Sequence, residues 1–166
     1  MPHRFTPAFI ATALTAFFSA FVLAASSPSH AARSLPRDGI VRVKSSYSLD
    51  ETVIRLKKDI EAKGIKFFDA IDQSKLGADA GIKLNPSTLL VFGNPPLGIQ
   101  FLTANPYAGL DWPVRLLVTE NGKGEVWLAY TDFEWIARRH GITSRNAQFK
   151  MAGEVIASIT SSVVKQ

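Results

Sequence analysis

The chain has 166 residues, a length typical of one domain, and a formal net charge of +5. It contains no cysteine, which excludes disulfides, cysteine-based zinc sites and thiol nucleophiles. The basic residues are scattered among acidic ones, with no run of five or six, so the charge pattern predicts a solvated surface and no nucleic-acid partner. No metal site is predicted.

The N-terminal stretch 1–31 has the features of a secretory signal peptide. Arg4 precedes an unbroken run of apolar and small residues, 8–25, and the small-x-small pattern Ser29-His30-Ala31 follows it. We therefore predict cleavage after Ala31 and an exported protein, periplasmic or secreted. The apolar run is also just long enough to span a bilayer, so an uncleaved anchor is the alternative and the one membrane attachment that we consider.

Residues 32–43 are predicted to form a polar lead-in and a first strand, and residues 44–142 the main α+β domain. Ser48 and Glu51 form a capping box at the start of a helix, which Gly64 ends in the left-handed cap position. The apolar stripe of this helix consists of Leu49, Val53, Leu56 and Ile60. An amphipathic helix that packs on a sheet is the natural interpretation.

Two further strands are predicted at 65–71 and 88–92. The later strand is apolar at every position after its first residue, so we expect it to be central in the sheet and covered on both faces. Asn94 caps the short helix that follows, and Pro95 or Pro96 fits its first position because the missing N–H costs nothing there. The pair Asn105-Pro106 ends that helix.

A β-hairpin is predicted from strands at 114–119 and 125–130, joined by the Asn121-Gly122 turn. Alternation in the second strand places Trp127 on the opposite face from Val126. Trp127 is therefore a candidate for an interface or a ligand pocket.

Two helices close the chain. A second capping box at 131–134 begins a helix that runs to His140, and residues 143–166 form a C-terminal amphipathic helix. The resulting order, β-α-β-β-β-β-α, defines an α+β fold in which at least the hairpin strands are antiparallel.

Several short motifs follow one another in the main domain. They are Asp72, Gly81 with Leu84-Asn-Pro86, Thr88-Leu-Leu-Val-Phe-Gly-Asn-Pro95, Ala104-Asn-Pro106, Leu110-Asp-Trp-Pro113 and Val126-Trp-Leu-Ala-Tyr130. In these motifs the chain resembles the bacterial family called domain of unknown function 302. The resemblance implies a curved antiparallel sheet of TATA-binding-protein-like architecture, with helices packed on one face, and pairing as a homodimer. It implies no established activity.

The chain departs from that family's pattern at two places. The family commonly has Asp-His where this chain has Asp72-Gln73, and Gly-Thr where it has Gly98-Ile99. Some members are reported to bind haem, and a role that rests on a histidine at position 73 is excluded here. We therefore predict no cofactor. Haem held by His140 and Met151 is the alternative.

Groups suited to catalysis are sparse in the sequence. Asp69, Asp72 and Asp111 lie next to turns, where aspartate is ordinary, so none is assigned a catalytic role. The candidate ligand-binding residues are Asp72, Asn94, Pro95, Asp111, Arg115, Trp127 and His140. The favoured interpretation is an exported, non-enzymatic homodimer that binds a small apolar or planar ligand, because the aromatic residues exceed the needs of the core. The alternative is a periplasmic, hydrolase-like enzyme with a carboxylate cleft.

Overall fold

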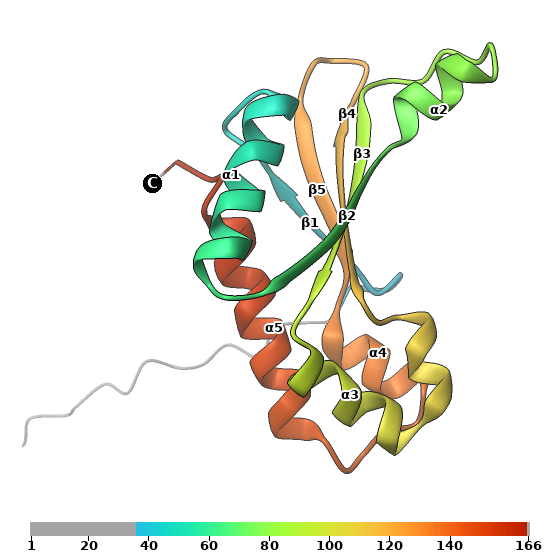
Figure 1. Ribbon diagram of the computed structural model, residues 1–166, viewed down its shortest axis with the longest axis vertical. Coiled ribbons are helices and arrows are strands. Elements are labelled where there is room, and N and C mark those ends of the chain that lie inside the picture. The colour runs from blue at the N-terminus through green and yellow to red at the C-terminus, as the bar shows by residue number, and fades with distance from the viewer. Residues whose placement is uncertain (1–35, 166) are drawn as a thin grey trace, which may run out of the picture. The chain divides into compact units, whose positions relative to one another are not determined.

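The computed structural model describes residues 36–165, so the predicted signal peptide lies outside the described residues. The elements in chain order are β1 (Ile40–Lys44), α1 (Leu49–Ala62), β2 (Lys66–Asp72), α2 (Gln73–Asp79), β3 (Ser87–Gly93), α3 (Pro95–Ala104), the 3-10 helix η1 (Pro106–Leu110), β4 (Val114–Glu120), β5 (Val126–Thr131), α4 (Phe133–Arg139) and α5 (Asn146–Ser161) (Figure 1). The predicted α+β class is confirmed. Among the residues described, no helix is both long and apolar enough to cross a bilayer.

The five strands form one open antiparallel sheet in the order β1-β5-β4-β3-β2. The β4–β5 hairpin is confirmed, and β4 is the middle strand. β3 is an interior strand, paired with β4 and β2, as predicted, but the prediction that it is covered on both faces is wrong. It lies next to the edge strand β2, and its residues alternate between buried Leu90 and Phe92 and half-buried Leu89 and Val91. An all-apolar strand does not reveal whether both of its faces are covered by the chain.

Helices α1 and α5 pack side by side on one face of the sheet, while α3 and α4 lie at one end of it and α2 at the other (Figure 1). The apolar stripe of α1 is confirmed, because Leu56 and Ile60 are fully buried. The buried face of α5 carries Phe149, Ala152, Ile156 and Ile159. These side chains meet the inward residues of the strands to form a single core.

Local signals in the sequence fix most of the helix ends. The hydroxyl of Ser48 accepts a hydrogen bond from the backbone N–H of Glu51, and Gly64 follows α1 with a φ of 65°. The predicted capping box at 131–134 is corrected in one respect. Asp132 is the cap residue of α4, because Thr131 is still paired in β5 and the carboxylate of Asp132 accepts from the N–H of Trp135 at 3.0 Å.

A candidate ligand pocket between α3 and α5

The connection from β3 to α3 positions the first residues of the site. Asn94 is the N-cap of α3, and its side-chain oxygen accepts a hydrogen bond from the backbone N–H of Leu97 at 3.4 Å. Pro95 occupies the first helical turn, where a missing N–H is tolerated. Both roles agree with the sequence prediction. The side-chain Nδ2 of Asn94 makes no hydrogen bond within residues 36–165.

Trp112 packs against two glycines, Gly93 at the end of β3 and Gly98 inside α3. A Cβ atom at position 98 would lie 1.9 Å from the indole Nε1, and one at position 93 would lie 3.1 Å from it. A side chain at position 98 therefore cannot coexist with the indole in its present place. Phe68 contacts the same ring edge-on, with the ring centroids 6.3 Å apart.

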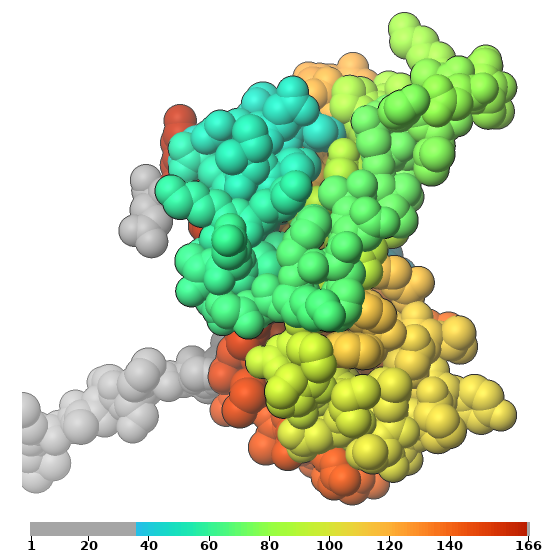
Figure 2. Space-filling model, in the orientation of Figure 1, coloured from blue at the N-terminus to red at the C-terminus, as the bar shows by residue number. Residues whose placement is uncertain are grey.

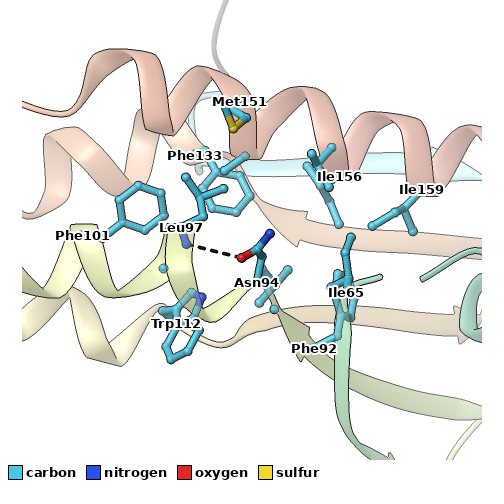
Figure 3. A pocket seen from close by; sticks show the side chains of 15 residues that line it. Ile65, Phe92, Asn94, Leu97, Phe101, Trp112, Phe133, Met151, Ile156 and Ile159 are labelled. Atoms are coloured by element: carbon cyan, nitrogen blue, oxygen red, sulfur yellow. Dashed lines mark hydrogen bonds between the residues drawn. The ribbon is translucent and has the colours of Figure 1, made fainter. Parts of the chain in front are cut away.

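A cavity of about 80 Å³ lies between α3 and α5 (Figure 3). In Figure 2, α5 is seen between α1 and α3 on this side of the molecule. The apolar lining of the cavity includes Phe92, Leu97, Phe101, Phe133, Ile156 and Ile159. Met151 lines the cavity from α5, and 54% of the surface of this residue is exposed. One water-sized group needs about 10–15 Å³, so there is room for several such groups or for one small organic molecule.

The lining of the cavity is almost entirely apolar. None of the side chains that line the cavity is acidic or basic, and none carries a hydroxyl or thiol. The polar groups are the amide of Asn94 and the indole of Trp112, whose Nε1 donates no hydrogen bond among the described residues. Both free groups are hydrogen-bond donors. The pocket thus fits a small apolar molecule with one acceptor atom, and it offers no group for acid–base or nucleophilic chemistry.

An ion cluster beside the pocket is centred on Asp111, whose side chain is only 3% exposed. Its carboxylate accepts hydrogen bonds from Nη1 of Arg139, at 3.1 Å to each oxygen, and from Nη2 of Arg115 at 3.3 Å. The Nε2 of His140 lies 2.6 Å from the same carboxylate. Charge-assisted bonds of this kind are stronger than neutral ones, so they fix the backbone that carries Trp112 to the end of α4.

The predicted site residues do not form one site. Asn94 lines the pocket, and Pro95 follows it at the start of α3 but is not among the lining residues. Asp111, Arg115 and His140 come together in the neighbouring cluster. Asp111 and Arg115 are four residues apart in the sequence, whereas His140 follows Asp111 by 29 residues, so the fold brings His140 to the cluster.

Asp72 lies at the other end of the sheet, where it is the N-cap of α2. The hydroxyl of Ser74, and next the backbone N–H of Lys75, hold the pKa of Asp72 below its ordinary value. Asp69 is on β2, with its carboxylate accepting from the backbone N–H of Ala70. Neither carboxylate joins Asp111, so these three acids do not line a common cleft.

The haem alternative also lacks a shared site in the described residues. Met151 lines the pocket, whereas the Nε2 of His140 faces Asp111 and the histidine side chain is 6% exposed. Within residues 36–165, no group of three or more histidine, aspartate or glutamate residues is placed to hold a metal ion.

Sequence reasoning did not single out the pair that shapes the pocket, Trp112 and Gly98. One local signal was present, since an isolated glycine inside a helical segment often marks a close packing contact. Its partner was not visible, because Trp112 follows η1 and meets α3 through the fold. Trp127, by contrast, lies on the predicted face of β5, opposite the buried Val126.

The fold and the site together describe an α+β domain with an open five-stranded sheet and a small apolar pocket at one end. The sequence matches the family described as "Domain of unknown function DUF302" over residues 41–162, and the chain belongs to this family. The match extends through the whole of α5. A crystal structure of an uncharacterized conserved DUF302 protein from Bacillus stearothermophilus has the same fold, with a TM-score of 0.69 and 16% identity over 75% of this chain and 98% of that one.

Curated relatives come from Brucella. The chain is 36% identical over 109 residues to proteins called "Fluoride-specific ion channel FluC 1" in Brucella suis biovar 1 and in Brucella abortus biovar 1. The matched segment is 66% of this chain but only 43% and 40% of those two proteins. The chain therefore spans less than half the length of the curated relatives that it matches.

Proposed function

We propose that this protein is an exported, non-enzymatic binding domain that takes a small apolar molecule with a hydrogen-bond acceptor into the pocket between α3 and α5. The observation that carries the proposal is the composition of the pocket wall. It is apolar apart from two donors, the side-chain amide of Asn94 and the indole of Trp112, and it contains no titratable side chain. An acceptor on the ligand would satisfy a donor that otherwise loses its hydrogen bonds to water.

Export is supported by the apolar N-terminal run and the small-residue pattern that ends at Ala31. Pairing of two copies is supported by the segment around α2, which carries three exposed apolar side chains. Leu76, Ile82 and Leu84 are 58%, 60% and 47% exposed. Exposed apolar side chains gathered in one place are typical of contact surfaces, so we propose this segment as the dimer contact.

The test of ligand binding uses cyclohexanone, which has a carbonyl acceptor, and methylcyclohexane, which has nearly the same shape and no acceptor. Titration is followed by NMR on protein purified from the export compartment. We expect preferential binding of the ketone. Trp112→Phe keeps an aromatic ring but removes the donor, and it should reduce the preference by about 0.5–1.5 kcal/mol.

Two matched controls separate the pocket from general effects. Trp135→Phe changes a tryptophan outside the pocket and should leave the preference unchanged. Ala152→Leu fills the pocket and should abolish binding of both probes, whereas Ala157→Leu, on the same helix but outside the pocket, should not. Equal binding of ketone and hydrocarbon, or binding that survives Ala152→Leu, would contradict the proposal.

Pairing is tested separately by sedimentation equilibrium. A dimer that becomes a monomer on Leu84→Glu supports the α2 contact, and Ile54→Glu, at an even more exposed apolar position on α1, is the control. A wild-type monomer at all concentrations would refute pairing without touching the pocket.

A second candidate function is a role beside a fluoride channel. It is favoured by the name of the Brucella relatives, although that name belongs to whole proteins of which the matched segment is less than half. The test compares growth in fluoride of cells that have or lack this chain. Greater sensitivity without the chain would support the role, and unchanged sensitivity would refute it.

A further inference from the structure

The open face of the sheet, opposite α1 and α5, carries a band of apolar side chains that the described chain leaves half-exposed. The band consists of Ile71, Leu89, Val91, Leu117, Trp127 and Ala129. A hollow of about 540 Å³ lies over part of this band, and its lining includes Leu89, Leu117, Ala129, Arg115 and Trp127. Antiparallel sheets usually place polar residues on a face left to water, so this apolar band indicates an occupant.

Arg115 provides charge at one end of the hollow. Its Nη2 donates to the carbonyl of Leu110 at 2.6 Å and to Asp111 at 3.3 Å. Its Nε and Nη1 donate no hydrogen bond within residues 36–165, and 51% of the side chain is exposed. Arg115 and Arg139 share the single carboxylate of Asp111, so the cluster keeps an excess positive charge.

The other cations near the hollow are already paired. Arg42 forms an ion pair with Asp38 at 2.8 Å, and Lys44 forms one with Glu125. Lys44 also lies over the ring of Trp127, 5.9 Å from its centroid. Arg115 differs from them because two of its guanidinium nitrogens, Nε and Nη1, donate no hydrogen bond among the described residues and the carboxylate that it contacts is shared with Arg139.

The spacing along the strands gives the length of the occupant. Trp127 pairs with Thr119, which lies four residues after Arg115 on β4. At about 3.3 Å per residue, Arg115 and this pair are roughly 13 Å apart along the strand. Leu117 and Ala129 are paired between the two levels. An extended alkyl chain fits this path, with its head group at Arg115 and its tail near Trp127.

We propose that the open face binds a linear hydrophobic carboxylate. The planar guanidinium of Arg115 matches a carboxylate in a forked arrangement, and the apolar band covers the chain. A second copy of this protein is the less suitable occupant. Arg115 lies on the middle strand, so two sheets packed face to face about a two-fold axis that runs along β4 would bring two like charges together. The site is separate from the pocket between α3 and α5.

The test is calorimetric titration of the purified protein with decanoate, and with decanol as the uncharged match, both below the concentration at which they aggregate. We expect decanoate to bind about tenfold more tightly than decanol, because a hydrogen-bonded charge pair is gained. Arg115→Gln should remove this difference. Arg42→Gln, at the β1 edge of the same hollow, should keep it.

A second variant keeps the test valid if Arg115→Gln does not fold. Ala129→Glu places a carboxylate in the hollow at a half-exposed position and should weaken decanoate more than decanol. Trp112→Phe, in the other pocket, should change neither affinity. The proposal is overturned if Arg115→Gln binds decanoate as the wild type does, or if neither probe binds. It is also overturned if sedimentation shows a wild-type dimer that Ala129→Glu dissociates and to which decanoate does not bind.

Discussion

The two faces of the sheet are built from the same strands but meet different surroundings. On the covered face, Leu90, Leu116 and Leu128 have no exposed surface beneath α1 and α5. On the open face, Leu89 and Leu117 are only half-buried. Apolar area removed from water stabilises the folded state in proportion to its extent, so the covered face supplies most of the stability. The apolar residues of the open face are better explained by binding than by folding.

The largest expected effect comes from neighbouring leucines of β4. Leu116→Ala leaves a cavity in a closed core and should lower the free energy of unfolding by about 2–5 kcal/mol. Leu117→Ala removes the same atoms from the open face and should cost less than about 1 kcal/mol, since water already reaches the site. Urea unfolding of the two variants measures the difference. Equal losses would show that the open face is buried in solution.

The ion cluster links the two faces, because Asp111 is buried while Arg115 extends over the open face. Asp111→Asn removes the charge that Arg139, His140 and Arg115 share, and it should cost about 1–3 kcal/mol. The matched control is Asp79→Asn, which breaks an exposed pair with Lys75 and should cost no more than about 1 kcal/mol. Thermal and urea unfolding measure both. A cost for Asp111→Asn no greater than the control's would contradict a stabilising role for the cluster.

Two glycine variants compare α3, at the end of the sheet, with α5, on its covered face. Gly98→Ala would place a Cβ where the indole of Trp112 now lies, and overpacking of this kind typically costs about 1–3 kcal/mol. Better helix propensity offsets part of that cost, so the net loss should be on the order of 1 kcal/mol. Gly153→Ala, in α5, meets nothing within 4 Å and should stabilise the protein slightly. If both variants gain stability, the indole is free to move aside.

Local patterns in the sequence predicted the elements that depend on neighbouring residues. The cap at Ser48, the cap at Asn94 and the outward position of Trp127 each follow from contacts or alternation within a few residues, and the structure has all three. The half-exposed face of β3 did not follow from its pattern. An apolar residue in the sequence does not show whether a helix, a ligand or another chain covers it. The alternate exposure along β3 could therefore not be predicted.

The pocket and the ion cluster were beyond local reasoning for the same physical reason. Asp111 meets Arg139 and His140 across 28 and 29 residues of sequence, and the indole of Trp112 meets Gly98 only after η1 has reversed the chain. The residue types were noticed in part, but their convergence depends on the packing of α3 and α4 at the end of the sheet. Tertiary contacts of that kind leave no periodic signal in the sequence.

The smallest expected effect concerns the rim of the open face, where Glu125 accepts hydrogen bonds first from Lys44 and next from Asn121. These bonds hold the pKa of Glu125 below its ordinary value. A lowered pKa in the folded state adds stability at pH values above the ordinary pKa of about 4.3, and this stability is lost as the pH falls through the pKa of the folded state.

Glu125→Gln should therefore be less stable than the wild type at neutral pH. The gap between the two urea midpoints should narrow as the pH falls from about 6 to about 3. A gap that stays constant over this range would mean that the Lys44 contact does not persist in solution, and the rim beside Trp127 would then be open to a ligand's approach.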